Sequence, residues 1–163
     1  MNNVPPSVWR NPTHFLAFGF GSGAAPFAPG TFGTLAAIPI YLLLQDLSWY
    51  SYLLVVSVGF AWGVSLCGRT AADIGVHDHS GIVWDEFIGY LLAMFMAPKG
   101  WLWVVVGFLL FRVFDILKPW PINRLDREVH GGLGIMLDDV LAGIYACAGL
   151  HALVWAGHRF ALL

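Results

Sequence analysis

The sequence predicts an all-α protein embedded in a membrane, and three observations lead to this fold class. Hydrophobic residues make up 58% of the 163 residues and charged residues only 11%, less than half of the ~25% of a typical soluble domain. The 8 basic and 10 acidic side chains are too few to cover a globule of this size. Long neutral intervals separate the charged positions. We therefore expect a polytopic helical membrane protein with one domain over residues 1–163, including short tails at residues 1–13 and 159–163.

About five short helices are expected to be embedded in the membrane: residues 34–44, 50–66, 87–97, 101–117 and 140–158. The second lies in an interval without ionised side chains and is long enough for a hydrocarbon core of about 30 Å. The fifth carries small residues at Ala142, Gly143, Ala146 and Gly149, which suit close helix packing in lipid. The other three are shorter, and the break around Pro98 separates two of them as a hairpin.

The distribution of basic residues predicts the orientation in the membrane. If all five helices cross, the N-terminal segment and the loops at residues 69–86 and 118–139 share one face. That face carries Arg10, Arg69, Arg112, Lys118, Arg124 and Arg127, whereas Lys99 and Arg159 lie opposite. By the positive-inside rule, the polar loops gather on the cytoplasmic face. A net charge of −2 leaves no polybasic surface for nucleic acid, so this class of partner is excluded.

The first polar segment, residues 19–34, is rich in glycine and precedes an apolar helix. Thr31 or Thr34 is a candidate N-cap for that helix. Glycines let backbone N–H groups approach a ligand, and a helix N-terminus favours an anion, so the region of Thr31 is a candidate phosphate cradle. The alternative is a loop that only turns the chain into the membrane, because the pattern is neither a Walker A nor a Rossmann motif.

The second polar segment places five ionisable side chains within ten positions: His77, Asp78, His79, Asp85 and Glu86. Asp85 and Glu86 fall in the first turn of an apolar helix, where unpaired carboxylates are costly unless they bind a cation. Carboxylates that leave room for water and phosphate are typical Mg²⁺ ligands. A capping role is the alternative for Asp85. For the histidines, metal binding or acid–base catalysis stands beside simple hydrogen bonding in the loop.

The third and fourth segments add buried charges of both signs. Arg112, Asp115 and Lys118 follow each other at i, i+3 and i+6 of a helix, so adjacent members meet. A structural ion pair between Arg112 and Asp115 is one alternative, and a functional role is the other. Lys118 stands at the helix exit, where it suits a phosphate. Asp138 and Asp139 form a second acidic pair at the start of the last apolar segment. Together these residues favour metal-assisted phosphoryl chemistry.

Missing motifs narrow the mechanism. Neither Cys67 nor Cys147 is followed by arginine at C-x5-R spacing, and both lie in apolar stretches typical of buried thiols. The sequence also lacks a D-x-D motif, a P-S-G-H motif and a D-G-x-x-A-R run. Covalent cysteine chemistry is therefore excluded. Attack by a metal-activated water is favoured, and a nucleophilic Asp or Thr31 is the alternative.

Four blocks together resemble the bacterial phosphatidylglycerophosphatase A family: GFGSGAAPFAPGTFGT, GVHDHSGIVWDEFIG, FRVFDILKPWPI and HGGLGIMLDDVLAG. They occur in the family's order and span residues 15–143, most of the chain. The resemblance implies a Mg²⁺-dependent phosphatase of the bacterial inner membrane. Such an enzyme removes the terminal phosphate of phosphatidylglycerophosphate, a membrane lipid, to give phosphatidylglycerol.

With this resemblance in view, we expect particular roles for the residues of the four blocks. Asp85, Glu86, Asp138 and Asp139 are the expected metal ligands or water activators, with Asp85 and Asp115 also counted as catalytic. Arg112, Lys118 and Thr31 are expected to hold the phosphate, and Asp78 or His77 to protonate the leaving alkoxide. The alternatives are a transporter, whose charges would line the bilayer midplane and often occur in duplicated halves, and a non-catalytic membrane scaffold.

Overall fold

Every regular element that the structure describes is helical. The computed structural model describes residues 4–76 and 79–159. The described chain forms α1 (Pro12–Ala17), α2 (Pro29–Leu44), α3 (Trp49–Ile74), α4 (Trp84–Ala93), α5 (Trp101–Leu117), α6 (Ile122–Glu128) and α7 (Gly131–Arg159). Two 3-10 turns, Pro6–Trp9 and Ser22–Ala24, lie on either side of α1. The all-α class is confirmed, since no strand occurs within the described ranges.

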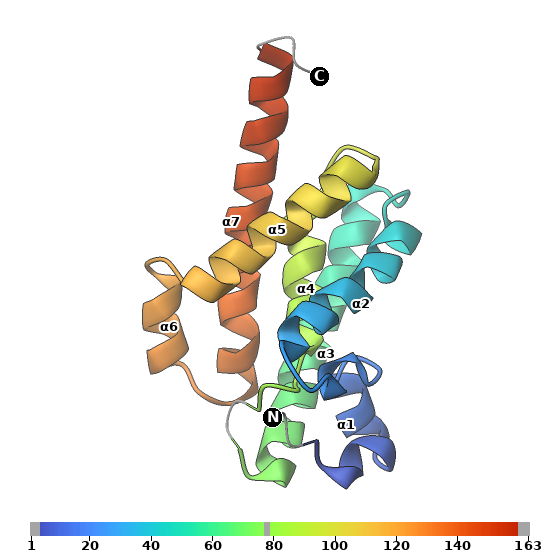
Figure 1. Ribbon diagram of the computed structural model, residues 1–163, viewed down its shortest axis with the longest axis vertical. Helices are drawn as coiled ribbons and strands as arrows, with labels where there is room; N and C mark the ends of the chain where they lie inside the picture. The colour runs from blue at the N-terminus through green and yellow to red at the C-terminus, as the bar shows by residue number, and fades with distance from the viewer. Residues whose placement is uncertain (1–3, 77–78, 160–163) are drawn as a thin grey trace.

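Two helices have the length and composition of membrane spans. They are α3, with 26 residues, and α7, with 29. At about 1.5 Å per residue these helices measure roughly 39 and 44 Å, more than a hydrocarbon core of about 30 Å. Figure 1 shows α7 rising beyond the other helices. Since α2, α4 and α5 have 16, 10 and 17 residues, each is shorter than the ~20 residues of a typical span.

Several helices begin or end away from their expected boundaries. Helix α2 begins at Pro29, after Ala28 in a left-handed conformation, so the expected N-cap at Thr31 or Thr34 is wrong. Proline at the first helical position suits this start, because its missing N–H has no helical partner there. Helix α7 begins at Gly131, so Asp138 and Asp139 lie two turns inside it rather than at its mouth. Helix α3 continues past Arg69 to Ile74 and ends at Gly75, which takes up a left-handed φ of +75°.

The short helix α4 forms the centre of the core. Seven of its ten residues are buried. Its side chains Phe87 and Tyr90 and the following Met94 are almost fully buried, and they belong to one cluster with Phe111 of α5 and Leu150 of α7. Because helices surround α4, its first turn is held at a fixed place inside the protein.

Glycines allow α7 to approach its neighbours at backbone distance. A Cβ atom on Gly143 would lie 2.3 Å from the carbonyl oxygen of Gly89 in α4. A Cβ on Gly132 would lie 1.9 Å from the carbonyl oxygen of Val64 in α3. Close packing of the small residues in the last helix is thus confirmed for Ala142, Gly143 and Ala146, which are buried.

Replacing Gly143 with alanine should destabilise the protein. The added methyl group meets backbone, which cannot rotate away, so we expect a loss of about 1–3 kcal/mol. Thermal unfolding of the detergent-solubilised protein measures this loss. Gly149→Ala, in the same helix, is the matched control, because its Cβ would meet only side-chain carbons at 3.6 Å or more. Equal unfolding temperatures for the two variants would contradict the packing described here.

Candidate active site

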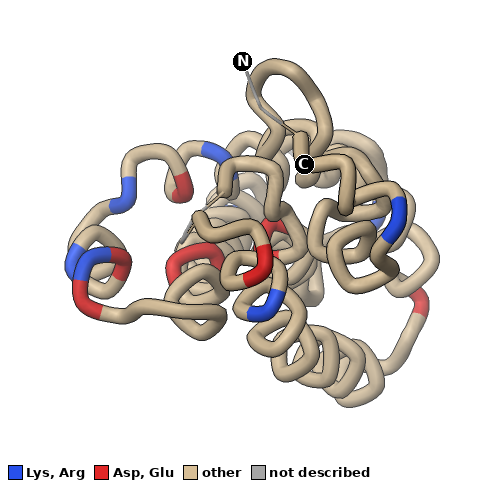
Figure 2. Tube along the Cα trace, turned by 90° about the horizontal axis from the view of Figure 1, so that it is seen from below, with Lys and Arg blue, Asp and Glu red and all other residues tan. Residues whose placement is uncertain are grey.

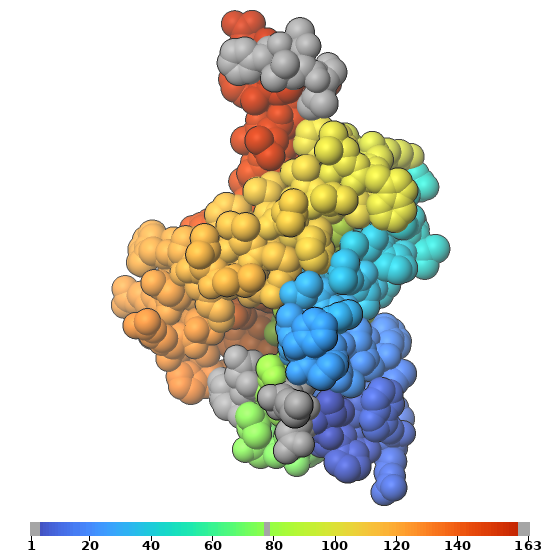
Figure 3. Space-filling view, in the orientation of Figure 1, coloured from blue at the N-terminus to red at the C-terminus, as the bar shows by residue number. Residues whose placement is uncertain are grey.

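A polar cavity of about 330 Å³ lies where the N-termini of α2 and α4 meet the C-terminus of α5 and the first turns of α7. Figure 3 shows the surface hollowed between α6 and the start of α2, below α5. Eight of the lining residues carry ionisable side chains: Asp85, Glu86, Arg112, Asp115, Lys118, Asp126, Asp138 and Asp139. In Figure 2, acidic segments from separate parts of the chain gather near the centre of the view.

Three carboxylates form an acidic cluster at this cavity. Asp115, Asp138 and Asp139 each place an oxygen so that all three lie within 4.8 Å of one another. Oxygens on opposite sides of an octahedral Mg²⁺ are about 4.2 Å apart, so small side-chain movements would suffice for binding. The Oδ1 atom of Asp138 is buried and accepts no hydrogen bond from the described residues. A carboxylate oxygen such as Asp138 Oδ1, beside the carboxylates of Asp115 and Asp139, is a suitable ligand for a hard divalent cation.

Arg112 connects the acidic cluster to helix α4. Its Nη1 atom donates to Asp115 Oδ2 at 2.8 Å and also pairs with Glu86 Oε2. The expected contact between Arg112 and Asp115 at i, i+3 is confirmed. The additional bond to Glu86 shows that Arg112 belongs to a larger network than one helical ion pair. A charged group this well enclosed needs its partners, because water reaches little of it.

Two residues of α2, Gly30 and Thr34, belong to the same network. Both lie in the glycine-rich segment, of which Thr31 was the residue expected in the site. The Thr34 hydroxyl donates to Glu86 Oε2 at 2.6 Å. A Cβ on Gly30 would lie 2.0 Å from Glu86 Oε1 and 3.3 Å from Arg112 Nη1. Positions 30 and 34 are one helical turn apart and therefore share a face. The spacing of four residues is the feature of the sequence that places Gly30 and Thr34 on the same helix face. It can be used only when α2 is known to begin at Pro29.

Lys118 lies between α6 and α7 at the rim of the cavity. Its Nζ atom donates to Asp126 at 2.8 Å and to Asp138 at 2.7 Å. Burial by itself would lower the pKa of Lys118, but the hydrogen bonds to Asp126 and Asp138 outweigh burial and raise it. Lys118 also holds a left-handed φ of +40°, as does Ala28 on the opposite side with +44°. Such backbone conformations cost about 1–3 kcal/mol and tend to cluster at functional sites.

The structure brings together most of the residues that the sequence singled out. The cavity is lined by Asp85, Glu86, Arg112, Asp115, Lys118, Asp138 and Asp139. Thr31 is not among its lining residues, which include its neighbour Gly30 instead. Asp85 Oδ1 accepts the backbone N–H of Glu86 at 3.0 Å, but Asp85 lies in the first turn of α4 and the N-cap is Val83, so Asp85 is not the helix cap. His77 and Asp78 lie outside the described residues.

The nearby histidine that is described, His79, has a local role in the loop. Its Nδ1 atom accepts the backbone N–H of Gly81 at 3.0 Å, and its ring packs against Phe18 at a centroid distance of 5.4 Å. His79 is also absent from the residues that line the cavity. These contacts favour a role for His79 in hydrogen bonding within the loop over a role in metal binding or acid–base catalysis.

Fold and site together define a class of protein: a helical protein with membrane-length helices and one polar cavity that combines clustered carboxylates with two basic side chains. Comparison with known proteins gives the family. The family model of phosphatidylglycerophosphatase A matches residues 15–154. The chain therefore belongs to the phosphatidylglycerophosphatase A family, and the resemblance seen in its four sequence blocks is confirmed.

Two curated relatives carry the family's name, Phosphatidylglycerophosphatase A. The one from Escherichia coli K12 is 53% identical over 153 residues, which cover 93% of this chain and 87% of the relative. The one from Haemophilus influenzae Rd is 48% identical over 145 residues, which cover 88% of this chain and 89% of the relative. No solved structure matches this chain significantly.

The two lysines of the chain should react differently with an amine reagent. Lys118 has a raised pKa and two carboxylate partners, so little neutral amine is available. Lys99 is 71% exposed in its pair with Asp46. Peptide mapping after brief acetylation at pH 8 should find Lys99 modified at least about tenfold faster, since reaction requires the neutral, accessible amine. The variant Asp138→Asn should speed the reaction at Lys118. Equal rates for both lysines in the unmodified sequence would contradict the described pairing.

Proposed function

We propose that this chain hydrolyses the terminal phosphomonoester of phosphatidylglycerophosphate to phosphatidylglycerol and inorganic phosphate, as a lipid phosphatase of phosphatidylglycerol synthesis. The observation that carries this proposal is the cavity in which three clustered carboxylates lie beside Arg112 and Lys118. We infer the substrate from the name of two relatives, Phosphatidylglycerophosphatase A, which match about nine-tenths of the chain.

The acidic cluster is the proposed site for Mg²⁺. Asp115, Asp138 and Asp139 supply three oxygens within 4.8 Å of one another, and Asp85 lines the same cavity. A Mg²⁺ ion held there would polarise a phosphoryl oxygen and favour deprotonation of the attacking water. Glu86 was also expected to be a ligand, but its contacts with Thr34 and Arg112 favour a role in orienting Arg112.

The side chains of the cavity provide the other groups that the reaction needs. Arg112 and Lys118 are suited to bind the phosphate oxygens, because both present charged N–H donors at the cavity. In the reaction, a water oxygen bonds to phosphorus while the bond from phosphorus to the glycerol oxygen breaks. Asp85 is the proposed acceptor of the water proton. The proton for the leaving alkoxide is assigned to Asp78 or His77.

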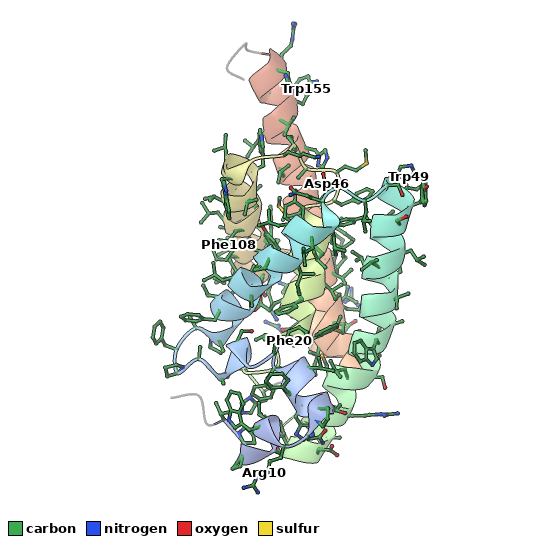
Figure 4. All side chains as sticks on the ribbon, turned by 90° about the vertical axis from the view of Figure 1, so that its right-hand side faces the viewer. Arg10, Phe20, Asp46, Trp49, Phe108 and Trp155 are labelled. Carbon is green, nitrogen blue, oxygen red and sulfur yellow. The ribbon has the colours of Figure 1, made fainter. Side chains whose placement is uncertain are left out.

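We place the protein in the bacterial inner membrane with its cavity facing the cytoplasm. Figure 4 shows Arg10 at one end of the molecule, whereas Asp46 and Trp49 lie toward the opposite end. Lys99 pairs with Asp46 and so shares that second end. The cavity, in contrast, holds Arg112 and Lys118. This division of basic residues follows the positive-inside rule.

Exposed apolar residues beside the cavity are suited to contact the lipid. Phe27 precedes the lining residue Ala28 and is 68% exposed, and Leu117 precedes the lining residue Lys118 and is 72% exposed. The cavity volume is at the small end of the roughly 300–1,000 Å³ of ligand pockets. It therefore suits a phosphate headgroup, while the acyl chains would lie against the apolar surface outside.

Removing single carboxylates of the acidic cluster should abolish turnover. In detergent micelles with Mg²⁺, Asp138→Asn and Asp139→Asn should each lower phosphate release by on the order of 100-fold, because a lost ligand weakens metal binding and positioning. A chelator should stop the unmodified enzyme. Asp46→Asn removes an exposed carboxylate at the far end and should leave activity near normal. Normal turnover of both cluster variants would overturn the metal assignment.

If Phe27 and Leu117 contact the lipid, the effect of replacing them should depend on the length of the substrate's acyl chains. Phe27→Ser and Leu117→Ser should lower activity several-fold on long-chain phosphatidylglycerophosphate. An acyl chain would cover each side chain only in part, so each contact contributes about 1 kcal/mol, less than the ~1.5–3 kcal/mol of full burial. Activity on a soluble short-chain analogue should change little. Leu43→Ser is the control, because Leu43 is also strongly exposed, at 81%, but lies at the far end of α2. Equal losses on both substrates would show that these residues do not act through the acyl chains.

A further inference from the structure

We propose that Thr34 is a positioning residue, which holds Glu86 so that Glu86 fixes the Arg112 guanidinium beside the acidic cluster. This inference rests on the proposed function, in which Arg112 binds the substrate phosphate. Thr34 lies on α2, Glu86 on α4 and Arg112 on α5, so the three residues join three helices at one point.

The contacts of Thr34 are those of a buried group with a defined partner. Its side chain is completely buried, and its hydroxyl lies 2.6 Å from Glu86 Oε2 and 3.0 Å from the carbonyl oxygen of Gly30. A hydroxyl has one proton to donate, and a carboxylate is the stronger acceptor. Arg112 Nη1 also approaches the hydroxyl oxygen, at 3.4 Å. The threonine thus touches both members of the ion pair.

The position of Glu86 determines where the guanidinium lies. Arg112 Nη1 is shared between Glu86 on one side and Asp115 on the other, and the Nε atom of Arg112 is buried without a hydrogen-bond partner among the described residues. If Glu86 rotated away, Arg112 would keep one of its two ion-pair partners among the described residues, Asp115. On its other side Glu86 fits against Gly30, where no side chain competes for the space. Thr34 and Gly30 together therefore restrict Glu86 to one orientation.

The test compares Thr34→Val, which keeps the shape but removes the hydroxyl, with Thr34→Ser, which keeps the hydroxyl. On phosphatidylglycerophosphate micelles with Mg²⁺, Thr34→Val should lower kcat/KM by roughly 10- to 100-fold, the range seen when a partner of a site residue is lost. Thr34→Ser should recover most of that loss. Thr70→Val is the matched control, because Thr70 is also fully buried but its hydroxyl has no partner among the described residues.

A second measurement tests the inference without turnover. In ¹⁵N spectra, the Nε–H resonance of Arg112, assigned with Arg112→Lys, should be sharp in the unmodified protein and in Thr34→Ser but broadened in Thr34→Val. An unchanged resonance in Thr34→Val would overturn the positioning role. So would unchanged kcat/KM, or a failure of Thr34→Ser to recover activity. An unmodified protein that releases no phosphate from the lipid would instead overturn the proposed function, and the resonance would still decide the role of Thr34.

Discussion

The repulsion between buried and partly buried carboxylates is the constraint on which the rest of the structure depends. Asp115, Asp138 and Asp139 place oxygens within 4.8 Å of one another, and Glu86 is buried close by. In a poorly hydrated interior such charges repel strongly and lose much of their solvation. The protein supplies part of the compensation itself, through Arg112 and Lys118. The remaining negative charge makes the cavity suitable for a divalent cation, whereas Arg112 and Lys118 make it suitable for a phosphate.

Helix packing keeps these charges together in spite of their repulsion. The central helix α4 brings Glu86 to the cavity, and the backbone contact at Gly143 and Gly89 sets the distance from α4 to α7. Phe111 packs on Gly89 as well, and it precedes Arg112 in α5. Apolar packing within the helices thus determines the geometry of the polar site. The proposed function requires such a site to lie where a lipid headgroup can enter it.

Local sequence patterns predicted part of this arrangement. The scarcity of charge and the long neutral apolar intervals predicted the helical class, and α5 was predicted with its observed limits. The i, i+3 spacing predicted the contact of Arg112 with Asp115. The start of α7 was missed, because the glycines at residues 131–134 have low helix propensity. Packing outweighs that propensity, since only glycine at position 132 lets α7 approach Val64. The contact of Thr34 with Glu86 spans 52 residues and therefore has no local signal.

The direct test of the central claim is to locate a bound cation. Crystals grown with Mn²⁺ in place of Mg²⁺ would give an anomalous signal at each ion. We expect a strong peak between Asp115, Asp138 and Asp139, at about 2.1–2.3 Å from a carboxylate oxygen of each, as hard divalent cations bind oxygen. A crystal of active protein in which Mn²⁺ binds elsewhere, or leaves these three carboxylates without a peak, would contradict the account.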